Sequence, residues 1–243
     1  MAERAALVTG GSSGIGLAIA RALAEDGYGL TISSRRADKL EATAETLRSE
    51  GHEVHAIAAQ IADEDEMKGV VAAHRDAYGR LDVLVNNAGV GLGEPIHELT
   101  AKKVDLQIEV NLRSLMLMTR ECLPMLREAG AEHHKALIVN TASVAGKAGQ
   151  AWLSVYSATK FAVIGFSQAT QREVSGQGIG VTALAPGFVD TPMTEFVKEH
   201  VPAEEMIQPT DIAEAVRFLL KTSPNCVVPE IVFLRPSDSE GLL

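Results

Sequence analysis

A tyrosine and a lysine four residues apart are the side chains of this sequence best suited to move a proton. Tyr156 and Lys160 stand near the start of a segment with helical periodicity, so their spacing places both on one helix face. A lysine ammonium beside a phenol stabilises the phenolate and lowers the phenol pKa from about 10 toward the range of a general base. The same spacing also arises by chance in helices, so other residues must support the pair.

Two polar residues that precede this pair are candidates for the same site. Ser143 follows an apolar run typical of a buried strand, and ligands of open α/β sheets bind beyond the carboxyl ends of the strands. Asn111 directly precedes an apolar helical segment. Each has a structural alternative, because Ser143 could turn the chain after its strand and Asn111 could cap the helix that begins at Leu112.

A glycine-rich turn follows the first apolar run of the chain. Its glycines allow a tight turn and a close approach of the backbone to a pyrophosphate, and the next helix offers N–H donors at its N-terminus. The spacing G-x-x-x-G-x-G differs from the dinucleotide fingerprint G-x-G-x-x-G and lacks the lysine of a P-loop. A purely structural turn is the alternative to a phosphate site formed by Gly10, Ser12, Ser13, Gly14, Ile15 and Gly16.

The end of the second predicted strand indicates which cofactor binds. An acidic residue at this place binds the ribose 2'-hydroxyl of NAD, whereas arginine accommodates the 2'-phosphate of NADP. Here the chain reads Ser34-Arg35-Arg36 and has no carboxylate. We therefore expect NADP(H), with Arg35 as the main phosphate ligand, while Arg36 could instead be a solvated residue of the next helix.

The elements that must position these residues alternate between short β-branched runs and longer helical segments. This alternation indicates repeated βαβ units and a parallel sheet covered by helices on both faces. Strands are predicted over 5–9, 29–33, 53–58, 81–86, 135–141, 179–185 and 229–234. Helices are predicted over 15–26, 37–50, 64–78, 100–128 with a possible break, 153–176 and 210–221. The chain is thus expected to be an α/β protein, a single Rossmann-like doubly wound domain over residues 1–243.

Composition restricts the partners of the chain. With 243 residues and no linker it fits one domain, and 46% hydrophobic and 22% charged residues are typical of globular proteins. A net charge of −10 disfavours nucleic acids and anionic membranes. No segment resembles a signal peptide or a membrane span, so we expect a cytoplasmic protein.

Cysteine and histidine give no sign of a metal site. Cys122 and Cys226 lie in apolar surroundings without C-x-x-C spacing, which predicts buried thiols in a reducing compartment. The seven histidines form no zinc motif, and we expect them on the surface.

The segment at about 186–209 is the longest without predicted regular structure. Loops of this length are often functional, and apolar residues such as Met193 and Phe196 argue for a lid over something apolar. A small helix packed on the core is the alternative. Lys147 could meet an anionic substrate group if it points inward.

Taken together, the motifs resemble those of the short-chain dehydrogenase/reductase family over about residues 5–235. The glycine turn after Thr9 matches the family's T-G-x-x-x-G-x-G motif, and Asn86-Asn87-Ala88-Gly89 matches its N-N-A-G segment. Pro186-Gly187 followed by Thr191 matches the segment that holds the nicotinamide. The catalytic tetrad of the family corresponds to Asn111, Ser143, Tyr156 and Lys160.

The resemblance implies a role for each of these residues. Tyr156 would transfer the proton at the substrate oxygen, Lys160 would hold the ribose hydroxyls, and Ser143 would polarise the carbonyl. Asn111 would position a water that links Lys160 to solvent. Strand order 3-2-1-4-5-6-7 follows as well. The cofactor site would also include Gln60, Ile61, Asn87, Ala88, Gly89, Pro186, Gly187, Val189 and Thr191, and the substrate site Val144, Gln150, Trp152 and Phe188.

Two departures from the family pattern stand out. Gln60 occupies the place where the family usually has an Asp that contacts the adenine. The C-terminal region, at 229–236, lacks the Asp-Gly-Gly ending of many 3-oxoacyl-carrier-protein reductases, so the chain looks more like the subgroup acting on small hydroxy acids, serine or varied carbonyls.

Apolar residues surround most of the predicted helix at 112–126, which indicates burial on both sides. Family members commonly form dimers or tetramers through this helix and the helix of Tyr156, so we expect a homo-oligomer, either a dimer or a homotetramer. Coverage by loops of the same chain is the alternative.

The function predicted from the sequence is an NADP(H)-dependent oxidoreductase, a carbonyl reductase type that interconverts a carbonyl and an alcohol by hydride transfer. A 3-oxoacyl-carrier-protein reductase and an NAD-linked alcohol dehydrogenase are the enzymatic alternatives. A cofactor-binding regulator without turnover is the non-enzymatic one, because fold alone does not establish catalysis.

Overall fold

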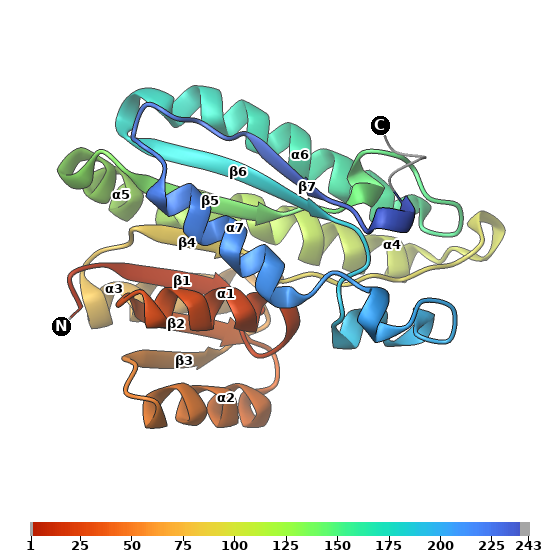
Figure 1. Cartoon of the computed structure of the whole chain (residues 1–243), viewed down its shortest axis with the longest axis horizontal. Helices are drawn as coiled ribbons and strands as arrows, with labels where there is room; N and C mark the ends of the chain where they lie inside the picture. The colour runs from red at the N-terminus through yellow and green to blue at the C-terminus, as the bar shows by residue number, and fades with distance from the viewer. Residues whose placement is uncertain (1, 239–243) are drawn as a thin grey trace.

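We analysed a computed structural model, which describes residues 2–238. One parallel sheet of seven strands runs through the described residues in the order β3-β2-β1-β4-β5-β6-β7, with helices on both faces (Figure 1). This arrangement confirms the predicted fold class and strand order. The ends of the predicted domain, 1–243, lie outside the described residues.

The strands agree with the predicted runs to within two residues at each end, and every neighbouring pair is parallel. They are β1 (Ala5–Thr9), β2 (Gly29–Ser34), β3 (Val54–Ala58), β4 (Val83–Asn86), β5 (Ala136–Thr141), β6 (Ile179–Pro186) and β7 (Glu230–Phe233).

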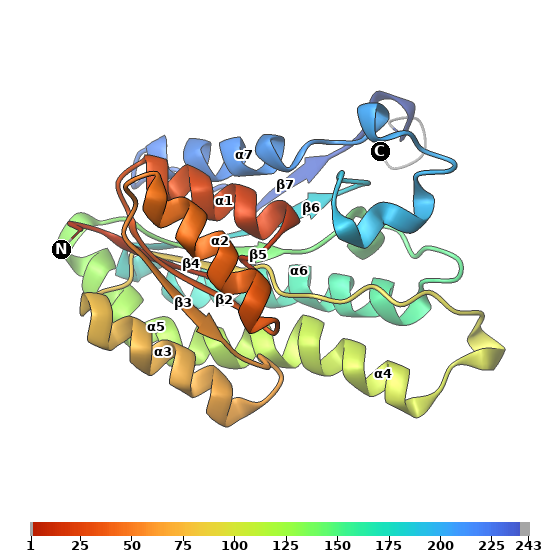
Figure 2. The ribbon, with the colours of Figure 1, turned by 90° about the horizontal axis from the view of Figure 1, so that it is seen from below.

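Helices cover the two faces in sets of three and four (Figure 2). On one face lie α1 (Gly14–Glu25), α2 (Ala37–Ser49) and α7 (Pro209–Lys221). On the other lie α3 (Glu64–Tyr78), α4 (Ala101–Ile108), α5 (Ser114–His133) and α6 (Ser154–Val174). Successive strand residues alternate between the faces, so Val83 and Val85 pack with α1 and α7 while Leu84 packs with α3 and α5.

The predicted helix at 100–128 is interrupted, in agreement with the possible break expected from the sequence. A π-helical turn, Glu109–Arg113, joins α4 to α5, and α5 continues to His133, beyond the predicted end. Turns of this kind often occur at functional sites. Asn111 lies inside the turn and is buried, so it does not cap the helix that follows.

The segment at 186–209 is more regular than predicted. It contains two short 3-10 helices, Pro192–Val197 and Ala203–Glu205, and a bridge between Val189 and Ile207. Val189 and Ile207 are buried, whereas Met193 and Phe196 are exposed. The base of the segment therefore packs on the core and its tip remains in solvent.

Two predictions about burial were wrong. Cys226 is exposed in the connection between α7 and β7, while Cys122 is buried as expected. His74 was expected on the surface and is completely buried. Its two ring nitrogens lie 2.8 Å from the Thr31 hydroxyl and 2.9 Å from the Arg80 carbonyl oxygen, and these hydrogen bonds offset the loss of water.

Within residues 2–238 we find no helix that combines the length and the apolar character needed to cross a membrane.

Candidate active site

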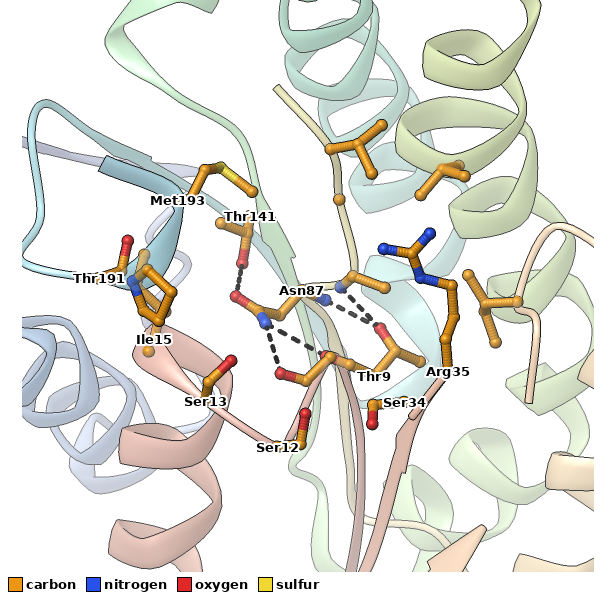
Figure 3. A pocket seen from close by; sticks show the side chains of 18 of the residues that line it. Thr9, Ser12, Ser13, Ile15, Ser34, Arg35, Asn87, Thr141, Thr191 and Met193 are labelled. Carbon is orange, nitrogen blue, oxygen red and sulfur yellow. Dashed lines mark hydrogen bonds between the residues drawn. The ribbon is translucent and has the colours of Figure 1, made fainter. Parts of the chain in front are cut away.

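A cavity of about 520 Å³ lies at the carboxyl ends of the strands (Figure 3). It adjoins the place where β1 lies between β2 and β4, where the order of connections reverses, and open α/β sheets bind ligands at such a point. Predicted site residues that line it are Gly10, Ser12, Ser13, Gly14, Ile15, Ser34, Arg35, Arg36, Gln60, Ile61, Asn87, Ala88, Gly89, Ser143, Tyr156, Lys160, Pro186, Gly187, Val189 and Thr191.

The glycine turn has a conformation and a packing that require glycine. Gly10 and Gly14 have φ angles of +67° and +53°, in the left-handed region. A Cβ atom on Gly16 would lie 2.3 Å from the carbonyl oxygen of Gly10, so this residue packs beneath the turn and not along the cavity wall. Ser13 is the N-cap of α1 but makes no side-chain hydrogen bond to the helix. The first turn of α1 is thus left open toward the cavity.

Asn87 joins three strand ends beneath the cavity (Figure 3). Its side-chain amide donates to the carbonyl oxygens of Thr9 at 3.2 Å and Gly10 at 3.4 Å, and its side-chain oxygen accepts from the Thr141 hydroxyl at 3.3 Å. The Thr9 hydroxyl accepts the backbone N–H groups of Asn87 and Ala88. This network fixes the glycine turn relative to β4 and β5.

The end of β2 forms the part of the cavity opposite Thr191 and Met193 (Figure 3). The Ser34 hydroxyl is buried there without a hydrogen-bond partner. Arg35 and Arg36 are exposed, and neither side chain makes a hydrogen bond or an ion pair with any residue in 2–238. An unpartnered hydroxyl beside two free guanidinium groups is suited to an anion with several oxygens.

Ser143, Tyr156 and Lys160 meet at the other part of the cavity. The Lys160 ammonium is buried, lies 5.5 Å from the centre of the Tyr156 ring and donates to the Thr141 carbonyl oxygen at 2.7 Å. Ser143 is the N-cap of a short 3-10 helix, Val144–Gly146, and its hydroxyl oxygen accepts the N–H of Ala145 at 3.1 Å. Tyr156 and Lys160 share the first turns of α6.

Burial dominates the protonation of this group. It raises the pKa of the Tyr156 phenol above its ordinary value, and a hydrogen bond with Ser143 partly opposes that shift. Burial lowers the pKa of Lys160 to about 8. The sequence-based expectation that Lys160 would lower the phenol pKa is not met, because burial raises that pKa, and at neutral pH Tyr156 carries its proton.

Asn111 lies beside this group but not in the cavity lining. Its side-chain oxygen accepts the Val90 N–H at 2.7 Å, and its amide donates to the Val90 carbonyl at 2.9 Å and the Thr159 hydroxyl at 3.2 Å. A Cβ atom on Gly89 would lie within 4 Å of both the Asn111 oxygen and the Lys160 ammonium. Asn111 thus connects α6 with the loop that follows β4, next to Lys160.

Four residues predicted to contact substrate do not line the cavity: Val144, Gln150, Trp152 and Phe188. Phe188 packs under Arg235, whose guanidinium lies 5.5 Å from the ring centre. Gln150 is exposed in the loop before α6, and Val144 is half-buried beside Ser143. Lys147 does not point inward either, because it forms an ion pair with Glu230.

Several lining residues had not been assigned to the site, among them Thr9, Val90, Val110 and Thr141, and Met193 had been named only as part of a possible lid. Thr9 and Thr141 end strands that were located correctly, so their position at the carboxyl edge was a usable signal. Met193 lies in a segment whose path depends on tertiary packing, and periodicity carries no information about it.

Comparisons with known proteins agree with this geometry. The sequence model of the short chain dehydrogenase family matches residues 4–202. The chain is 36% identical over 226 residues to a 3-oxoacyl-acyl-carrier-protein reductase of Staphylococcus aureus, covering 89% of this chain and 90% of that protein.

Solved structures of two reductases are also similar. An actinorhodin polyketide ketoreductase variant with NADPH has a TM-score of 0.87 at 34% identity, covering 96% of this chain and 97% of the other. A 3-ketoacyl-acyl-carrier-protein reductase of Brucella melitensis with NADH has a TM-score of 0.86 at 30% identity, covering 95% and 96%. The chain belongs to the short chain dehydrogenase family and is an oxidoreductase that interconverts a carbonyl and an alcohol.

Proposed function

We propose that this protein is an NADP(H)-dependent carbonyl reductase in which Tyr156 supplies the proton to the substrate oxygen. The observation that carries the proposal is that one cavity joins the glycine turn and the Ser34-Arg35-Arg36 corner to Ser143, Tyr156 and Lys160. A dinucleotide is an extended molecule. The glycine turn and the arginine corner would bind its phosphates at one end of the cavity, and Ser143, Tyr156 and Lys160 would serve proton transfer at the other end.

The residues present fit such a cofactor. The open first turn of α1 and the hydroxyls of Ser12 and Ser13 would hold the pyrophosphate, because N–H donors and the helix dipole favour an anion there. Asn87, Gly89 and the segment around Pro186 and Thr191 border the rest of the cavity. The bound cofactor supplies the hydride, and the protein supplies position, a proton and polar contacts.

The choice of NADP(H) rests on the residues after β2. Ser34 offers a hydroxyl without a partner, and Arg35 and Arg36 offer positive charge without a described counter-ion. Asp38, on α2, is the first carboxylate after this strand. A 2'-phosphate would be bound by charge-assisted hydrogen bonds, whereas the 2'-hydroxyl of NAD would find no acidic partner at the strand end. Among the similar structures, one contains NADPH and another NADH.

The chain's own groups are arranged for proton donation. Because burial keeps the Tyr156 phenol protonated at neutral pH, it can donate to the oxygen of a carbonyl as negative charge develops there. The Ser143 hydroxyl, which donates to the Pro186 carbonyl oxygen at 3.4 Å, would turn to donate to the same substrate oxygen and stabilise that charge. Lys160 would compensate the phenolate that remains and bind ribose hydroxyls, while Asn111 would position Lys160 and the water that returns the proton.

Two alternatives receive specific support. The named relatives favour a reductase of 3-oxoacyl groups over the small hydroxy-acid subgroup that the C-terminal segment suggests. An NAD-linked enzyme is compatible with the neighbour that contains NADH. A regulator without turnover is disfavoured, since binding alone does not require Ser143, Tyr156 and Lys160 around one cavity.

The proposal extends to assembly and location. A dimer or tetramer through α5 and α6 is supported by apolar side chains that the single chain leaves partly or fully exposed, including Leu117, Leu123 and Phe161. A cytoplasmic location is supported by the composition and by the absence of any spanning helix within residues 2–238.

The test is the substitution Tyr156→Phe, which removes one hydroxyl. We expect kcat for NADPH oxidation with a ketone to fall by about 10²- to 10⁴-fold, the usual contribution of a general acid, with the Kd for NADPH nearly unchanged. Stopped-flow absorbance and a binding titration measure the two quantities. Undiminished turnover in the variant, or no ketone-dependent NADPH oxidation by the wild type, would overturn the proposal.

A further inference from the structure

On the solvent side of Tyr156, three large apolar side chains are exposed that proteins usually bury. Trp152, Met193 and Phe196 are 51%, 46% and 57% exposed. Trp152 lies in the loop before α6, and the other two lie in the 3-10 helix Pro192–Val197 of the 186–209 segment. We call these three residues the aromatic rim.

The rim is continuous with the cavity. Met193 lines the cavity, and a Cβ atom on Gly91 would lie 3.7 Å from both the Met193 sulfur and the Tyr156 ring. Phe196 follows Met193 in the same short helix, and its ring centre lies 6.2 Å from that of Trp152, with the rings tilted by 59°. An apolar surface therefore extends from the proton donor to Trp152.

Trp152 is held at the rim at a cost. Its φ angle of +70° is in the left-handed region, which is unfavourable for a bulky residue. The Trp152 carbonyl accepts the Glu94 N–H at 2.7 Å, and the ring covers Gly93, where a Cβ atom would lie 2.6 Å from ring atoms. Backbone strain that presents a large apolar ring to solvent points to a ligand contact and not to core packing.

The charges around the rim disfavour an anionic ligand. The segments 90–98, 143–153 and 186–198, which form the loops around it, contain two lysines and no arginine. Lys147 pairs with Glu230 at 2.9 Å and Lys198 pairs with Asp190 at 3.0 Å. A substrate carboxylate would lose water there without gaining a free cation.

We propose that the substrate is an uncharged carbonyl compound that carries an aromatic ring or a similarly large apolar group. That group lies on the aromatic rim while the carbonyl oxygen faces Tyr156 and Ser143. The inference rests on the proposed function and adds the substrate class to it. Burial of the apolar group supplies binding energy that a small ketone lacks.

Three methyl ketones that differ only beyond the carbonyl test this proposal. They are 4-phenyl-2-butanone, 2-butanone and 4-oxopentanoate, which carry a phenyl group, a hydrogen and a carboxylate at equivalent positions. We expect kcat/KM with NADPH to be at least about 10-fold higher for the phenyl ketone than for 2-butanone. The value for 4-oxopentanoate should be no higher than that for 2-butanone. Equal values for all three, or a preference for 4-oxopentanoate, would overturn the proposal.

Variants of the rim assign the preference to its residues. In Phe196→Ala and Trp152→Ala, the ratio of kcat/KM for the phenyl ketone to that for 2-butanone should fall by about 3- to 10-fold. Phe218→Ala is the matched control, because Phe218 is 53% exposed on α7, which covers the face of the sheet opposite α6, and should keep the ratio within about twofold. An unchanged ratio in Phe196→Ala, whose side chain lies on a short surface helix, contradicts the proposal even if Trp152→Ala does not fold.

A binding measurement separates this inference from the proposed function. Trp152 is the only tryptophan of the chain, so intrinsic fluorescence excited selectively at tryptophan reports on the rim directly. In Tyr156→Phe with NADP present, 4-phenyl-2-butanone should change this emission saturably, and 2-butanone should not at the same concentration. If the emission is unaffected while the wild type reduces the phenyl ketone, the inference fails and the function stands. If Tyr156→Phe retains turnover, the function fails whatever the emission shows.

Discussion

At the residue scale, the site depends on a few groups whose partners are missing or whose protonation is shifted. The Ser34 hydroxyl is buried without a hydrogen-bond partner, Arg35 and Arg36 have no counter-ion within the described residues, and Lys160 has a pKa lowered to about 8. The buried hydroxyl and the buried lysine are costly in a structure that has no use for them, whereas the exposed arginines are solvated and supply positive charge at the cavity. Together they indicate a ligand and a proton that are part of the function.

The arginines give the first prediction. Replacing Arg35 with Ala should raise KM for NADPH by about 10-fold or more, since a charge-assisted hydrogen bond contributes about 1.5–3 kcal/mol, and should leave KM for NADH nearly unchanged. Initial rates with both cofactors measure the effect. Arg36→Ala is the matched control and should change the NADPH value less. Equal losses for NADPH and NADH in Arg35→Ala would contradict the assignment.

The positions of some site residues could be predicted from the sequence, and those of others could not. Tyr156, Lys160 and Ser143 were found because strand ends and helical spacing locate them, and the cavity includes all three. Trp152 was predicted as a substrate-site residue because it is a large apolar side chain. Its left-handed backbone and its contact with Gly93 depend on packing between distant loops and could not be predicted. Phe188 was assigned to the substrate and instead packs under Arg235, because sequence does not show which side of a loop a side chain takes.

At the element scale, close packing between the glycine turn and α1 sets the shape of the end of the cavity where the cofactor phosphates would bind. Gly16 has no room for a Cβ atom against the backbone of Gly10, whereas an atom added at Gly69 on α3 would meet nothing within 4 Å. The strands were predicted within two residues because buried parallel strands are continuous apolar runs. The π turn at Glu109–Arg113 leaves the apolar pattern unchanged, so only a possible break could be predicted there.

These two glycines provide a matched pair of substitutions. Gly16→Ala should lower the free energy of unfolding by about 1–3 kcal/mol and weaken NADPH binding, because the helix must move away from the turn. Gly69→Ala should raise the free energy of unfolding by up to about 1 kcal/mol, because alanine favours an exposed helix position. Urea unfolding of both variants measures the difference. A neutral Gly16→Ala would show that the turn adapts to the added methyl group.

At the scale of the whole molecule, a buried histidine of α3, which packs against the part of the sheet formed by β1, β2 and β3, affects stability. His74 on α3 is neutral, accepts from the Thr31 hydroxyl on β2 and donates to the Arg80 carbonyl oxygen. Burial lowers its pKa to about 4 from an ordinary value of 6.5, while the Arg80 hydrogen bond opposes the shift. Folding therefore favours the neutral ring, and an unfolded chain binds the proton more readily.

Stability should consequently decrease in acid. The contribution of His74 is complete above pH 6.5 and is lost as the pH falls toward about 4, with a slope of about 1.4 kcal/mol per pH unit and a total of about 3 kcal/mol. Urea unfolding between these pH values should show a flatter profile for His74→Gln than for the wild type. His97→Gln, at an exposed site, is the control and should keep the wild-type slope. Equal slopes in all three proteins would contradict the account.

The central claim is that this cavity transfers a hydride to a carbonyl carbon while Tyr156 protonates the oxygen. The most direct measurement follows deuterium from NADPH dideuterated at C4 into the alcohol formed from 4-phenyl-2-butanone, in the wild type and in Tyr156→Phe. We predict deuterium at the carbinol carbon in the wild-type product and almost no product from the variant. Alcohol without deuterium, or labelled alcohol formed equally fast by Tyr156→Phe, would contradict the claim.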